Sequence, residues 1–186
     1  ISDPEDRRHA VGKYAVGCGL FHDVGKLNFL HLYGKIGRQW LTGEYEMAQI
    51  HTQLGARRLL KRASTCRYAE VALGHHRWYD TTRGYPESFK RLESACRQMV
   101  DVIALIDWME NVTETDQLYT GVEKSFDEAL KEAVAQEGRQ FSPLLTAWLR
   151  DPKVAKSIRQ AFCDGRLEAC RTLYEEEGGE PLLHAF

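Results

Sequence analysis

The chain has 186 residues, of which 43% are hydrophobic and 28% are charged, so it is long enough for one well-formed core and short for two independent domains. Its formal net charge of −2 provides no basic field of the kind that binds duplex nucleic acid, which argues against nucleic acid polymers as partners. A local cationic pocket for one small phosphate ligand remains compatible with this charge. We expect one domain over residues 1–140 and a C-terminal helical extension, residues 141–186, that packs on the same domain.

The five cysteines are odd in number, widely spaced and without a Cys-x-x-Cys pair, which favours a reducing compartment. No apolar run has the length of a membrane span, and the first residues are too polar for a signal peptide. We therefore expect a cytoplasmic protein with no membrane insertion. Because the chain starts with Ile1 rather than Met, we expect it to be part of a longer protein.

Apolar residues recur at intervals of three and four rather than two, which predicts an all-α fold. Pro4 and the acidic residues after it predict a first helix that ends near Phe21, so that His22 would lie at its C-terminal end. A loop with room for one short helical turn is expected over residues 28–43. Further helices are predicted over about residues 44–62, 66–74, 88–113 and 125–136, and two more begin at Ser142-Pro143 and at Asp151-Pro152.

The helix predicted over residues 88–113 has the widest apolar face. Its buried face is expected to contain Leu92, Cys96, Met99, Val100, Ile103, Leu105 and Ile106. Asp107 interrupts this face. An ionised carboxylate on a strongly apolar helix face is costly unless a cation or several hydrogen-bond donors meet it, so Asp107 is a candidate metal ligand.

Other residues with metal-ligating side chains lie at predicted helix ends, at intervals that let several helices converge on one point. The candidate metal ligands are His22, Asp23, His51, His75, His76 and Asp107. Adjacent His and Asp suit a binuclear site, because a carboxylate can bridge two cations. Imidazole and carboxylate ligands without thiolate favour iron, manganese, nickel or zinc over calcium. Any one of these residues has an ordinary structural explanation, and only their joint pattern is specific.

Three segments resemble the signatures of a known enzyme family. Gly19-Leu-Phe-His-Asp-Val-Gly-Lys26 is similar to the signature of the HD superfamily of helical metal-dependent phosphohydrolases, with His22 and Asp23 as the named pair. The stretch from Gly74 to Pro86 resembles the second signature of the HD-GYP branch, whose triplet is here Gly84-Tyr85-Pro86. Residues 102–110 resemble the helix that carries the last metal-binding Asp. The resemblance implies an HD-domain helical bundle with a metal site between its helices.

The resemblance also implies an activity: hydrolysis of a cyclic dinucleotide, typically cyclic di-GMP, by a metal-activated hydroxide. The cofactor would be one or two divalent transition metal ions, iron or manganese, with nickel or zinc as alternatives, held by the six candidate ligands. The expected catalytic residues are Asp23 and Lys26. The expected substrate-binding residues are Lys26, Arg77, Asp80, Arg83 and Tyr85. An N-terminal regulatory module is also expected, because the family attaches such domains to sensory modules.

The sequence departs from the family in ways that keep alternatives open. Arg77 stands where the family has Glu, and Asp80-Thr-Thr-Arg83 replaces the usual Asp-Gly. Family members also carry a further upstream His, whereas His9 would lie about 20 Å from His22 along a continuous helix. The alternatives are an HD phosphohydrolase acting on another nucleotide or phosphate ester, and a degenerate, non-catalytic nucleotide-binding signalling domain. The C-terminal helices could cap the core, form a homodimer face or contact a further module.

Overall fold

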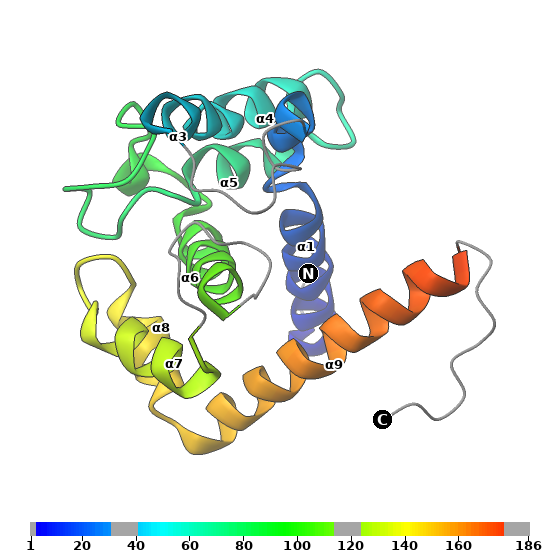
Figure 1. Ribbon diagram of the computed structural model, residues 1–186, viewed down its shortest axis with the longest axis vertical. Coiled ribbons are helices and arrows are strands. Elements are labelled where there is room, and N and C mark those ends of the chain that lie inside the picture. Colours follow the sequence, from blue (N-terminus) through cyan, green and yellow to red (C-terminus); the bar gives the residue numbers. More distant parts are fainter. Residues whose placement is uncertain (1–2, 31–40, 114–123, 177–186) are drawn as a thin grey trace. The chain divides into compact units, whose positions relative to one another are not determined.

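The computed structural model describes residues 3–30, 41–113 and 124–176 (Figure 1). The described part of the chain is helical and contains no β-sheet, which confirms the predicted all-α fold class. The α-helices are α1 (Pro4–Phe21), α3 (Thr42–Gln49), α4 (His51–Leu59), α5 (Ala69–Gly74), α6 (Arg97–Thr113), α7 (Phe126–Ala135), α8 (Pro143–Leu149) and α9 (Pro152–Glu176). The short 3₁₀ helices within these ranges are η1 (Val24–Phe29), η2 (Cys66–Tyr68) and η3 (Arg91–Glu93).

The chain divides into two compact units, residues 1–146 and 147–186, with the boundary inside α8. The predicted division after residue 140 and the packing of the extension on the domain stay predictions. The second unit contains α9, which begins where Asp151 Oδ1 accepts a hydrogen bond from the Lys153 amide at 2.8 Å. No helix in the described ranges combines the length and the apolar composition needed to cross a bilayer.

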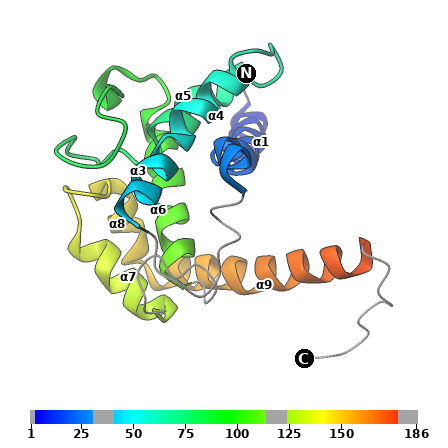
Figure 2. The ribbon, with the colours of Figure 1, turned by 45° about the horizontal axis from the view of Figure 1, so that its top comes forward.

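The core of the first unit forms where α1, α4, α5 and α6 meet. α5 contacts both α4 and α6, and α1 contacts α5 and α6. Both views show α4 and α5 side by side (Figure 1 and Figure 2). Buried apolar residues from these helices and the turns between them fill the space: Cys18, Ala56, Leu59, Tyr68, Ala69, Val71, Ala72, Phe89, Val100 and Ile103. The turns that end α1 and α5 are therefore held at fixed positions next to α4 and α6.

Two predicted helices are each divided into two elements in the structure. The helix predicted over residues 44–62 is two helices, α3 and α4, that meet at Ile50. At this point the His51 side chain bonds to the Ala48 carbonyl at 2.6 Å, and the Thr52 side chain bonds to the Gln49 carbonyl at 3.1 Å. These side-chain bonds compete with the backbone hydrogen bonds of a continuous helix. The predicted helix 66–74 starts instead as η2. Its first residues are preceded by Thr65, so the expected Ser64 cap is also wrong.

α6 begins nine residues later than predicted. Arg91 and Asp101 are both buried and form a two-pronged ion pair, with Arg91 Nε donating to Asp101 Oδ1 at 2.7 Å. In a continuous helix, residues ten apart would be separated by about 15 Å along the axis, so this pair requires the chain to turn before α6. Leu92 consequently lies in η3 and is exposed, and Ile106 is also exposed, in contrast to the predicted buried face.

Candidate metal centre

The residues predicted as metal ligands converge within the first unit. His22 and Asp23 directly follow α1, His51 is the first residue of α4, His75 and His76 directly follow α5, and Asp107 lies on α6. Their ligand atoms form two groups, in each of which all atoms lie within 4.8 Å of one another: Asp23 with His51, His75 and His76, and Asp23 with His22 and Asp107. Asp23 is thus common to both groups.

Gly25 allows the turn after α1 to approach α4 this closely. A Cβ atom at this position would lie 1.9 Å from the His51 carbonyl oxygen and 2.8 Å from the Gly55 nitrogen. Both neighbours are backbone atoms, which cannot rotate away as a side chain could. A residue without Cβ is therefore required for Asp23 to face His51.

Three of the histidines are oriented in the same way by the backbone. Nδ1 of each ring lies within hydrogen-bond distance of the carbonyl oxygen three residues earlier: 2.7 Å for His22 and Gly19, 2.6 Å for His51 and Ala48, and 3.0 Å for His75 and Ala72. A carbonyl oxygen only accepts, so Nδ1 carries the proton and donates it. In the neutral form of each ring, Nε2 then directs a lone pair toward the cluster, as a metal-ligating imidazole does.

Asp23 lies between the two groups with one oxygen toward each. Its Oδ1 is 3.1 Å from His51 Nε2 and 3.7 Å from His75 Nε2, and its Oδ2 is 3.2 Å from His22 Nε2. Oδ1 is buried and has no hydrogen-bond partner among the described residues. Because the facing imidazole nitrogens of His51 and His75 are also acceptors, lone pairs converge on one point. A cation bound at this point would satisfy the buried carboxylate oxygen and both nitrogens at once.

The spacing of these atoms fits a transition metal. Two nitrogen ligands, each about 2.1 Å from a tetrahedral cation, lie about 3.4 Å apart. His51 Nε2 and His75 Nε2 are separated by 3.4 Å. No cysteine belongs to either group of the described residues, so the ligand chemistry remains imidazole and carboxylate. The residues present could hold one or two divalent ions, with Asp23 shared.

Asp107 and its neighbour Asn111 complete the second group. Asp107 is 7% exposed, and its Oδ1 lies 3.5 Å from His22 Nε2, while its Oδ2 lies 3.8 Å from His76 Nδ1. Asn111 Nδ2 donates to Asp107 Oδ1 at 2.9 Å and so fixes the carboxylate. Asn111 was not among the predicted site residues, although its position four residues after Asp107 places both on one helix face.

The pKa shifts favour the metal-binding forms of most of these side chains. Burial opposes the charged form of Asp23, but the imidazoles of His22, His51 and His75 that face it outweigh burial and hold its pKa far below the ordinary value. The pKa of Asp107 is lowered in the same way, against the effect of burial. Burial lowers the pKa of His75 and, more strongly, that of His76. For His22, burial lowers the pKa, but Asp107 and Asp23 outweigh it and raise the pKa to about 10. A cation would therefore displace a proton from His22.

The side chains predicted to bind substrate lie at different places relative to this cluster. Lys26 forms an ion pair with Asp23 Oδ2. Tyr85 lies against His76, with ring centroids 4.6 Å apart. The other three belong to the loop that follows His76: Arg77 donates to loop carbonyls, Asp80 Oδ1 accepts from Thr82 N and Oγ1, and Arg83 lies over the Trp78 ring. Their contacts with substrate stay predictions.

A cavity of about 180 Å³ borders the cluster. It is enclosed by α6, by the loop after His76 and by the turn at Gln140 and Phe141, and both His76 and Asp107 reach its wall. Aromatic side chains make up much of the remaining surface: Trp78, Tyr85, Trp108 and Phe141. If one atom of a ligand is bound at the cluster, the rest of that ligand could extend into the cavity.

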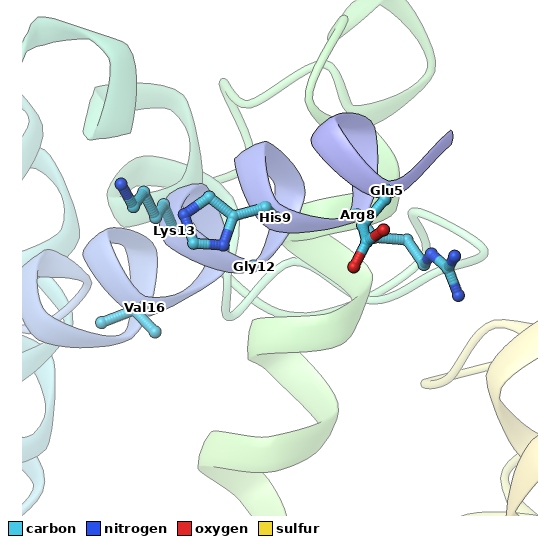
Figure 3. A pocket seen from close by; sticks show the side chains of 6 residues that line it. All are labelled: Glu5, Arg8, His9, Gly12, Lys13 and Val16. Atoms are coloured by element: carbon cyan, nitrogen blue, oxygen red, sulfur yellow. The ribbon is translucent and has the colours of Figure 1, made fainter. Parts of the chain in front are cut away.

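His9 lies apart from the cluster, as expected. It is exposed on α1, with Arg8 and Lys13 nearby, along an open hollow lined by side chains of this helix alone (Figure 3). Neither group of potential metal ligands includes it. The upstream histidine of the family therefore has no counterpart at this position.

The comparisons with known proteins provide no independent assignment. No protein-family model matches the chain, and the search of curated proteins finds no relative.

Proposed function

We propose that this chain is a metal-dependent phosphohydrolase of the HD superfamily, similar to the HD-GYP branch, that hydrolyses a cyclic dinucleotide such as cyclic di-GMP. The observation that carries the proposal is the position of Asp23, which is common to two groups of potential ligands and has a buried oxygen without a hydrogen-bond partner. Carboxylates that bridge two cations occur in phosphatases and nucleases, where the metals stabilise both the attacking and the leaving oxygen.

When bound, divalent metal ions supply Lewis acidity toward a phosphoryl oxygen and a water molecule that loses its proton more readily. The protein's own contribution is orientation and charge. Backbone carbonyls fix the rings of His22, His51 and His75, so little reorganisation is needed when the ligands bind. Lys26, which pairs with Asp23, is close enough to the cluster to neutralise a phosphate oxygen of the substrate.

The size of the neighbouring cavity favours a second candidate, hydrolysis of a smaller nucleotide or phosphate ester. Its volume of about 180 Å³ is below the roughly 300–1,000 Å³ of pockets that enclose a whole drug-sized ligand. Only part of a dinucleotide would enter this space. The two candidates share the metal centre and differ in substrate alone.

The test is hydrolysis of a panel containing cyclic di-GMP, linear dinucleotides and mononucleotides by protein purified without oxygen and supplied with ferrous or manganous ion. Asp23→Ala is expected to abolish both turnover and metal loading, whereas His9→Ala, which alters an exposed histidine outside the cluster, is expected to behave as wild type. Cleavage of cyclic di-GMP by wild type supports the first candidate, and cleavage of smaller esters alone supports the second. A metal-loaded protein that cleaves no member of the panel would contradict both and favour a non-catalytic signalling domain.

The other expectations are independent of this test. A cytoplasmic location, a homodimer and an N-terminal regulatory module remain predictions from the sequence.

A further inference from the structure

His76 differs from the other three histidines of the cluster in how its ring is held. No backbone carbonyl bonds to its imidazole among the described residues, and its Nδ1 is 3.8 Å from Asp107 Oδ2, beyond hydrogen-bond reach. Its ring is instead enclosed by aromatic neighbours, with centroids 4.1 Å from His75 and 4.6 Å from Tyr85. The plane of Tyr85 is inclined by 34° to that of His76. Contact with Tyr85 therefore restricts the orientation of the His76 ring, for which no hydrogen bond to a carbonyl is present among the described residues.

The loop that carries Tyr85 folds back tightly on the residue that it holds. The Tyr85 amide donates to the His76 carbonyl oxygen at 3.2 Å. Gly84 has φ +78°, and a Cβ atom there would lie 2.0 Å from the same oxygen. The loop can adopt this path only with glycine at this position.

Arg77 closes this loop. Its Nη1 donates to the carbonyl oxygens of Arg83 at 3.1 Å and Gly84 at 2.9 Å, and its Nη2 donates to that of Thr81 at 2.5 Å. Two of the bonded carbonyls, those of Arg83 and Gly84, belong to the residues just before Tyr85, and Arg77 itself directly follows His76. One planar guanidinium thus ties the two ends of the segment together, which the single ammonium of a lysine cannot do with the same geometry.

We propose that Arg77 is a positioning residue, which closes residues 77–84 and so sets the Tyr85 ring against the metal-facing imidazole of His76. This inference rests on the proposed metal centre. It assigns to Arg77 a role within the protein in place of the substrate contact expected from the sequence, because both of its Nη groups already bond to the loop. Its buried Nε has no hydrogen-bond partner among the described residues. Residues that orient a metal ligand without contacting the metal change metal affinity by about 10- to 100-fold when they are replaced.

The experiment compares cobalt binding by wild type, Arg77→Lys, Tyr85→Ala and the double variant, by titration of Co²⁺ followed through its visible absorption. Arg77→Lys is expected to weaken binding by about tenfold or more. If Arg77 acts through Tyr85, the double variant should bind no more weakly than Tyr85→Ala alone. The matched control is Arg139→Lys. Arg139 is exposed, and its guanidinium lies 6.0 Å from the ring of Trp78, a residue of the loop that Arg77 closes. This variant should bind cobalt as wild type does. Unchanged affinity in Arg77→Lys, or additive losses in the double variant, would overturn the proposal.

A second measurement on metal-free protein separates this inference from the proposed function. The Tyr85 ring should shift the ¹H resonances of the His76 ring, and Arg77→Lys should remove this shift while Arg139→Lys retains it. If wild type binds no cobalt but the shift is lost in Arg77→Lys, the proposed function fails and the positioning role stands. If the His76 resonances are the same in wild type and Arg77→Lys, the positioning role is refuted whether or not metal binds.

Discussion

Replacing Gly25 by alanine should disrupt the candidate metal centre, because the added Cβ atom would clash with the backbone of α4. The new Cβ atom would lie 1.9 Å from the His51 carbonyl oxygen, whereas ordinary contacts begin at 3.4 Å. The turn after α1 and the start of α4 would therefore have to separate by more than about 1 Å, and overpacking of this kind costs about 3 kcal/mol. The displacement would move Asp23 away from His51, so we also expect metal affinity to fall at least about tenfold.

Chemical denaturation of metal-free protein and titration with Mn²⁺ or Co²⁺ measure the two effects of Gly25→Ala. The matched control is Gly12→Ala, in the exposed middle of α1, where a Cβ atom meets nothing within 4 Å. That variant should be more stable than wild type by about 0.5–1 kcal/mol, because glycine is unfavourable inside a helix, and its metal affinity should be unchanged. A Gly25→Ala protein with wild-type stability and affinity would refute the close approach of the two backbones.

Two further predictions concern buried groups outside the cluster. Asp101→Asn should lower the free energy of unfolding by about 3–5 kcal/mol, because it leaves the buried Arg91 without its charged partner. Glu93→Gln, which removes an exposed ion pair with Lys90, should change the free energy of unfolding by less than about 1 kcal/mol. Equal effects in denaturant titrations would contradict the buried pair. Burial raises the pKa of the Cys18 thiol to about 11, so only about one molecule in a thousand carries the reactive thiolate at pH 8. Alkylation followed by mass spectrometry should therefore label the exposed Cys66 and leave Cys18 unmodified until the pH approaches 11. Rapid labelling of Cys18 at pH 8 in folded protein would show that it is not buried as described.

Several elements could be predicted from local sequence signals. Proline and the acidic residues after it identified the start of α1, Ser125 and Glu128 form the reciprocal hydrogen bonds of the expected cap of α7, and Pro143 and Pro152 begin α8 and α9. These signals depend on residues within one helical turn, so they can be recognised without knowledge of the tertiary structure. The convergence of the six candidate ligands also agrees with their positions at helix ends and on one buried face.

The remaining features depend on contacts between residues that are distant in the sequence or on side chains that compete with the helix. The start of α6 follows from the pairing of Arg91 with Asp101, which composition and periodicity do not indicate. The break between α3 and α4 results from the side-chain bond of His51 to the Ala48 carbonyl. Similarly, the bonds of Arg77 to three loop carbonyls depend on the path of the whole loop, which no local pattern in the sequence indicates.

The most direct test of the metal centre is the metal content of protein reconstituted with ferrous or manganous ion and then freed of unbound metal, measured by mass spectrometry of the dissolved metals. Wild type is expected to retain at least one ion per chain, His9→Ala to retain the same amount, and Asp23→Ala to lose most of it, because Asp23 belongs to both groups of ligands. A wild type that retains no transition metal, or an Asp23→Ala variant that retains as much as wild type, would contradict the account.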